Sequence, residues 1–107
     1  DVYKRQTRRE QLIINDYCER ELTCVAAELG KVLSVRRLHK CQAYVYETTS
    51  YYLLKSYATF VAFIRKSDCE CFDILCNVYG YSATSAKHIA KFKNDYHATS
   101  TQIWREV

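Results

Sequence analysis

The chain has 107 residues, with 16 Lys or Arg and 12 Asp or Glu, so its formal net charge is +4. This length supports one hydrophobic core, and 49% hydrophobic with 26% charged residues is the balance of a globular chain rather than a disordered one. The charge is too small for a chain dedicated to nucleic acid, and no apolar run reaches the roughly 18 residues of a membrane span.

The first six residues, 1–6, look like the in-frame translation of a transposase adapter from a sequencing library, and we exclude them from the fold. The chain contains no methionine. We therefore expect an open-ended piece of an environmental or metagenomic assembly, whose natural start lies upstream or at an internal Val or Leu codon.

From Arg8 to about Leu33, apolar residues recur at the spacing of one helical face, which predicts an N-terminal helix. That face consists of Ile14, Cys18, Leu22, Val25, Leu29 and Val32. Asp16 and Arg20 lie four residues apart in the order that favours an ion pair. The stretch from Val32 to Cys41 is basic and contains no acid, and it predicts a boundary between a helical extension (7–41) and a domain (42–107).

Beyond Cys41 the hydrophobic period becomes two, which indicates strands. Four segments, 43–48, 51–57, 59–65 and 69–75, are rich in aromatic or β-branched residues, and polar residues at 49–50 and 66–68 predict turns between them. Alternation predicts one apolar face formed by Phe60, Ala62, Ile64, Phe72 and Ile74.

A C-terminal helix over Ser82–Tyr96, with Ser82 as its N-cap, is expected to cover that apolar face. The predicted fold class is α+β: an antiparallel meander of three to four strands, the C-terminal helix packed on one face, and the N-terminal helix. The tail near Thr101–Trp104 has β character but is too short for an assignment.

The six cysteines lie inside periodic segments rather than in glycine-rich loops, so we expect reduced thiols and a cytoplasmic protein. Cys69 and Cys71 lie two residues apart on a predicted strand, which puts both sulfurs on one face, and His39 and Cys41 could add ligands for zinc. Their spacing is not that of a zinc knuckle, so we expect no metal and no cofactor.

The sequence contains no strained nucleophile elbow, no glycine-rich phosphate loop and no pair of separated in-strand carboxylates, so we expect a protein that is not an enzyme. A protein partner is the favoured hypothesis, because Thr84, Ser85 and His88 place polar groups at a helix start. No membrane partner is expected.

Nucleic acid is the alternative partner. Positive charge binds phosphate, and exposed aromatic rings stack on unpaired bases. The candidates for phosphate binding are Lys87, Lys91 and Lys93 on the C-terminal helix, with Arg36 and Arg37 before the sheet.

Two motifs in order carry a resemblance: Ser56–Ala62 has the pattern Ser-Tyr-x-Thr-x-Val-Ala, and Tyr81–Ile89 has the pattern Tyr-Ser-x-Thr-Ser-x-x-His-Ile. With these motifs the chain resembles a group of uncharacterised small proteins of gut bacteria and their phages. The resemblance covers about Tyr44–Val107 and leaves the N-terminal helix unmatched, which puts in question whether 7–41 belong to the domain. It implies a phage or mobile-element accessory protein and provides no activity to transfer.

Overall fold

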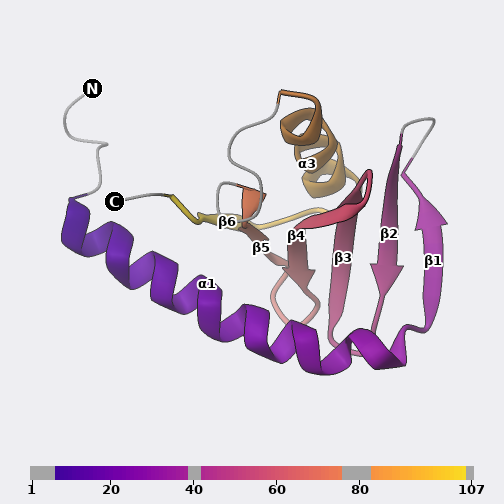
Figure 1. Cartoon of the computed structure of the whole chain (residues 1–107), viewed down its shortest axis with the longest axis horizontal. Helices are drawn as coiled ribbons and strands as arrows, with labels where there is room; N and C mark the ends of the chain where they lie inside the picture. The colour runs from indigo at the N-terminus through magenta and orange to yellow at the C-terminus, as the bar shows by residue number, and fades with distance from the viewer. Residues whose placement is uncertain (1–6, 39–41, 76–82, 106–107) are drawn as a thin grey trace.

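The computed structural model describes residues 7–38, 42–75 and 83–105, which form one sheet with a helix on each face (Figure 1). The elements in chain order are α1 (Arg8–Glu28), the 3-10 helix η2 (Leu29–Lys31), β1 (Ser34–Arg37), β2 (Ala43–Glu47), β3 (Tyr51–Ser56), β4 (Thr59–Arg65), β5 (Glu70–Asp73), α3 (Ala83–Asp95) and β6 (Ser100–Ile103). The α+β class and the N-terminal helix are confirmed. Within the described ranges, no helix has the length and apolar content needed to cross a bilayer.

The sheet has six strands in the order β1-β2-β3-β4-β5-β6. Neighbours from β1 to β5 are antiparallel, whereas β6 pairs with β5 in parallel. The predicted antiparallel meander is present in β2 to β5, but the sheet has six strands rather than three to four, and its last strand, β6, is parallel to its neighbour. The parallel pair follows from the connection, because the chain passes through α3 between β5 and β6, and a helical crossover returns a strand in the same direction.

A β-bulge in β4 controls which side chains face each helix. Leu54 of β3 pairs with Ala62, but the next residue, Lys55, pairs with Phe60. Val61 is thus an extra residue on β4, and the side-chain alternation shifts at that point.

This register corrects the predicted apolar face. Phe63 pairs with Phe72, and their rings stack with centroids 4.9 Å apart. Phe60 lies on the same face as these rings, whereas Ala62 and Ile64 lie on the opposite face. The sequence pattern had grouped Phe60, Ala62, Ile64 and Phe72 together, because period-two reading does not detect an inserted residue.

Each helix packs on its own face of the sheet. The α1 face contains Cys18 and Val25 of the helix and Tyr51, Leu53, Phe63, Phe72 and Ile74 of the sheet. The α3 face contains Ile89 and Phe92 with Leu38, Ala43, Val45, Leu54, Val61, Ala62, Ile64, Cys71 and Leu75. The sequence had predicted that the C-terminal helix covers Phe72 and Ile74. This prediction is wrong, because both residues lie beneath α1.

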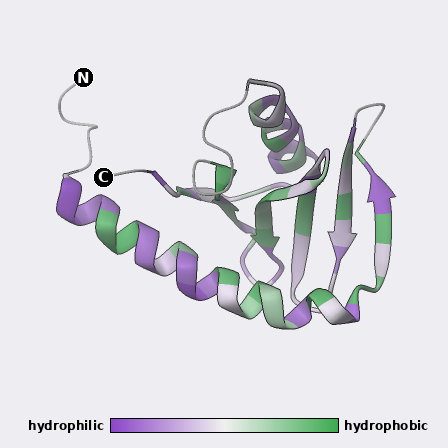
Figure 2. Cartoon of the chain, in the orientation of Figure 1, coloured by the Kyte–Doolittle hydropathy of each residue, from purple (hydrophilic) through white to green (hydrophobic). Residues whose placement is uncertain are grey.

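Polar contacts attach α1 across one end of the strands. Thr7 caps the helix by accepting a hydrogen bond from the Glu10 backbone, and the Glu10 side chain accepts one in return from the Thr7 amide. At the other end, Glu28 accepts hydrogen bonds from Thr48 Oγ1 at 2.7 Å and from the Ser50 amide at 3.1 Å. These bonds lower the pKa of Glu28, that from Thr48 most. Hydrophobic and hydrophilic residues are interspersed along the helix (Figure 2). The helix crosses one end of the strands, and no other described helix lies over the opposite end of this sheet face (Figure 1).

Candidate functional site

The polar residues at the start of α3 are largely inside the protein. Ser85 and His88 are 2% and 7% exposed, and both bond to Ser56 of β3. Ser56 Oγ lies 2.9 Å from Ser85 Oγ and 2.9 Å from His88 Nδ1. Only Thr84 of the three predicted partner-binding residues is exposed. A contact of these residues with a partner stays a prediction, and Ser82, the predicted N-cap, lies outside the described residues.

The contact between Ser56 and His88 pairs a hydroxyl with an imidazole nitrogen in the interior of the protein. Ser56 is fully buried, and Ser85 shares its hydroxyl. Burial lowers the pKa of His88, so its ring is neutral at pH 7. The exposed ring of Tyr57 lies 5.8 Å from the His88 ring, between centroids. The hydrogen bonds of Ser56 with Ser85 and His88 connect α3 to β3 in the interior.

The lysines of α3 do not share one side of the helix. Lys87 is exposed, and Lys91 Nζ lies 3.5 Å from Asp95 Oδ1. Lys93 lies on another side of the helix, near Asp73. Burial raises the pKa of Asp73, and the positive charge of Lys93 partly offsets this rise.

The two predicted phosphate-binding arginines are on the edge strand β1. Arg36 lies 5.2 Å from the ring centroid of Tyr96 and contacts its hydroxyl, on the α3 side of the sheet. Arg37 is exposed, and strand alternation directs it to the α1 side. The five candidates for phosphate binding thus lie over at least two surfaces, and binding of nucleic acid by them stays a prediction.

The described cysteines, Cys18, Cys24, Cys69 and Cys71, are free thiols. Burial raises the pKa of Cys71 to about 12 and that of Cys18 to about 11, so both remain protonated. Within the described ranges, no three His, Cys, Asp or Glu residues gather to hold a metal ion. His39 and Cys41 lie outside those ranges.

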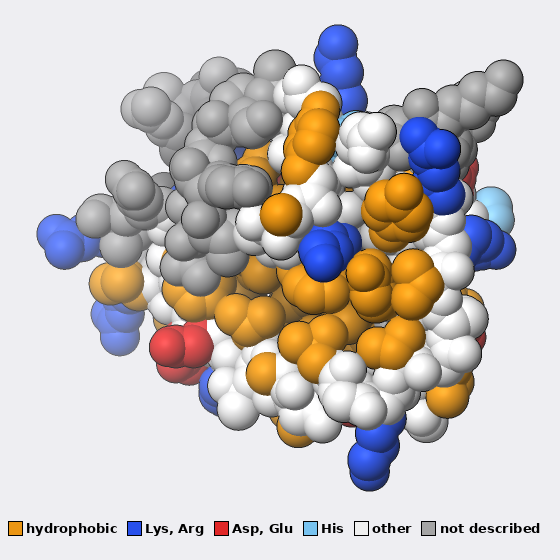
Figure 3. Space-filling model, turned by 45° about the vertical axis from the view of Figure 1, so that its right-hand side comes forward, with side chains coloured by type: hydrophobic (Ala, Val, Ile, Leu, Met, Phe, Trp, Pro, Cys, Tyr) orange, Lys and Arg blue, Asp and Glu red, His pale blue; other side chains and the backbone are white. Residues whose placement is uncertain are grey.

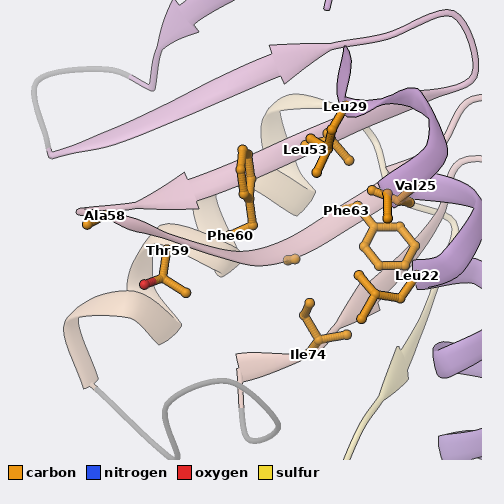
Figure 4. Close-up of a pocket in the computed structure, with 11 residues that line it drawn as sticks. Leu22, Val25, Leu29, Leu53, Ala58, Thr59, Phe60, Phe63 and Ile74 are labelled. Carbon is orange, nitrogen blue, oxygen red and sulfur yellow. The ribbon is translucent and has the colours of Figure 1, made fainter. Parts of the chain in front are cut away.

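An apolar groove opens between α1 and the uncovered end of the sheet (Figure 4). Its cavity has a volume of about 320 Å³. It is lined by Leu22, Val25, Ala26 and Leu29 of the α1–η2 segment, by Leu53, Phe60, Ala62, Phe63 and Ile74, and by Ala58 and Thr59 at the β3–β4 turn. Among the described lining residues, Thr59 alone has a polar side chain. Leu29, which helical periodicity had placed on the buried face of α1, is 38% exposed at this groove.

Two rows of cross-strand neighbours extend the groove over the sheet. The first row is Val35, Tyr46, Leu53, Phe63 and Phe72, and the second is Arg37, Tyr44, Lys55 and Phe60. The first row leads to Val35 on the edge strand, which is 52% exposed. The second row has two cations, two aromatic rings and no carboxylate. On the face seen in Figure 3, hydrophobic side chains gather around a Lys or Arg side chain.

Lys55 lies at the rim of the groove. Its Nζ is 5.6 Å from the ring centroid of Tyr46 and 5.6 Å from that of Phe60, and Phe60 lines the groove. The side chain is half-buried. No sequence motif singles out Lys55, although the alternation of Tyr44 and Tyr46 could have placed it on a shared face. The position of α1, which leaves this face open, has no local sequence signal.

Residues 27–106 match the model of DUF8033, a family of unknown function. The match covers most of the chain, so the chain belongs to this family. It includes the whole sheet and α3, and it leaves nearly all of α1 outside. No curated protein and no solved structure matches the chain.

Proposed function

We propose that this member of the DUF8033 family is a non-catalytic accessory protein that binds a segment of another protein in the apolar groove. The observation that carries the proposal is the groove itself, an apolar cavity beside α1 that opens to solvent. The resemblance to small proteins of gut bacteria and their phages supports a phage or mobile-element accessory role.

The shape of the surface favours an elongated occupant. A cavity of about 320 Å³ is at the small end of the range for sites that enclose a small molecule. The apolar surface continues beyond the cavity along the first row, through Tyr46 to exposed Val35. A peptide segment can place one side chain in the cavity and others along this row, as partner segments do in apolar grooves.

Two neighbouring alanines on α1 provide a matched test. Ala26 and Ala27 are both exposed helix residues, but only Ala26 lines the groove. Peptides selected from a random display library against the immobilised protein should contain apolar anchors. They should bind the Ala26→Arg variant at least tenfold more weakly than the wild type, and the Ala27→Arg variant equally well. Selected peptides that bind both variants alike, or a library that yields none, would contradict the proposal.

The second row supports a second candidate function, the binding of single-stranded nucleic acid. Arg37 and Lys55 alternate there with the rings of Tyr44 and Phe60, and such rings stack on bases while cations bind phosphate. This surface differs from the lysines of α3.

Fluorescence anisotropy with a mixed-sequence single-stranded oligonucleotide tests the second function. If Arg37 and Lys55 each contact one phosphate, the logarithm of the association constant should fall linearly with the logarithm of the salt concentration, with a slope of about −1.4. Lys55→Met should weaken this binding, and the Lys87→Met control should not. The reverse result would assign binding to α3, and salt-insensitive or absent binding would exclude this function.

A further inference from the structure

We infer that the partner segment carries a carboxylate, which binds Lys55 while a neighbouring apolar side chain fills the groove. The inference rests on the proposed protein-binding function and specifies the chemistry of the partner.

The first observation is that Lys55 has no counter-charge among the residues that the structure describes. Its ammonium group lies over Tyr46 and Phe60, and it has no ion pair with any described carboxylate. Lys66 provides the contrast: its Nζ lies 4.9 Å from the ring centroid of Tyr52, but also 2.6 Å from Glu47 Oε2. Both lysines are partly withdrawn from water, and only Lys66 is neutralised by the part of the chain that the structure describes.

The second observation is the charge of the uncovered surface. The second row contains Arg37 and Lys55, and neither row contains a carboxylate. An occupant that covers this surface removes water from Lys55, which costs free energy unless the occupant provides an opposite charge. A carboxylate meets this need, whereas an amine opposes it.

The third observation places the carboxylate close to the apolar anchor. Phe60 lines the groove and also lies beneath Lys55, so one ring separates the cavity from the cation. The two groups of the partner are therefore near one another in its sequence. A nucleic acid would provide negative charge, but its phosphates and sugars have no aliphatic side chain to fill the apolar cavity.

Two synthetic peptides test the inference. They share one pattern of leucine and phenylalanine and differ only in carrying glutamate or lysine at the flanking positions. Titration calorimetry at moderate salt should show that the glutamate peptide binds the wild type about tenfold more tightly, a ratio typical of one charge-assisted contact. Lys55→Met should abolish this preference, and Lys55→Arg should keep it.

Controls separate a local contact from the net charge of the protein. Lys87→Met removes an exposed cation on α3, on the opposite face of the sheet, and should leave the preference unchanged. If Lys87→Met reduces the preference as much as Lys55→Met does, the inference is overturned. It is also overturned if an oligonucleotide displaces the glutamate peptide in a manner that depends on Lys55, because phosphate is then the anion recognised.

The failure of this inference differs from the failure of the proposed function. If both peptides bind equally and Ala26→Arg weakens both, the groove binds protein segments, and the carboxylate inference alone is wrong. If neither peptide binds, or if Ala26→Arg has no effect on the binding, the proposed function and the carboxylate inference are both wrong.

Discussion

Replacement of Arg65 by methionine should destabilise the fold by detaching α1 from the sheet. The Arg65 guanidinium lies 2.8 Å from Glu21 Oε1 of α1, 2.7 Å from Asp68 Oδ2 and 3.0 Å from Glu70 Oε1. It also donates a hydrogen bond to Tyr17 Oη at 2.8 Å. Methionine keeps an apolar stem over the neighbouring rings and removes the only cation shared by these three carboxylates among the described residues.

The expected cost follows from burial. Removal of one partner from a buried ion pair costs about 3–5 kcal/mol, and an exposed pair contributes about 0–1 kcal/mol. The side chains of Arg65, Glu21 and Glu70 are 22%, 17% and 14% exposed, which is between these limits. After allowance for solvent screening, we expect the free energy of unfolding to fall by about 2–3 kcal/mol.

Urea denaturation followed by circular dichroism measures this loss. With an m-value of about 1–2 kcal/mol/M for a chain of this size, the midpoint should fall by roughly 1–2 M. Lys66→Met is a matched control on the next residue, because its ion pair with Glu47 is 25% and 37% exposed. That variant should lose about 0.5–1 kcal/mol.

A double mutant tests the cause. Because Arg65→Met leaves Glu21 close to other carboxylates, adding Glu21→Gln should restore part of the lost stability. The reasoning is refuted if Arg65→Met loses no more stability than Lys66→Met, or if Glu21→Gln lowers the stability of Arg65→Met further.

Three other predictions concern the core and the polar group beneath α3. Ser56→Ala should lower the free energy of unfolding by about 1–3 kcal/mol in urea denaturation, because it leaves buried Ser85 and His88 without a shared partner; a neutral effect would contradict this role. Burial lowers the pKa of His88, so the unfolded chain takes up the proton first as the pH falls below the ordinary value of about 6.5. Stability present above that pH is therefore lost below it, and urea midpoints of His88→Gln should fall less steeply than those of the wild type between pH 7 and pH 5. Phe63→Ala should cost about 3–5 kcal/mol and Phe63→Leu clearly less, since Phe63 is 1% exposed and stacks on Phe72; equal thermal midpoints for the two variants would exclude a packed ring at this position.

Local sequence signals predicted the elements better than their arrangement. The predicted N-terminal helix from Arg8 to about Leu33 is present as α1 and η2, and the predicted surface pair of Asp16 and Arg20 has a distance of 3.3 Å. The turns predicted at 49–50 and 66–68 separate β2 from β3 and β4 from β5. These features depend on residues within about four positions of one another, so the sequence displays them directly.

The candidate site depends on distant residues, and the sequence patterns did not indicate it. The rim position of Lys55 requires the bulge at Val61, which places Phe60 and Phe63 on one face. The groove also requires α1 to cross the strands at one end, where Glu28 bonds to Thr48 and Arg65 to Glu21.

The sequence by itself determined where the helix α1 and the central strands lie along the chain, because hydrophobic period and turn residues are local properties. The tertiary structure alone decided the parallel pairing of β6, the register of Phe63 with Phe72, and the part of the sheet that α1 leaves uncovered. These depend on contacts between residues far apart in the chain, and many such pairings satisfy the same alternation.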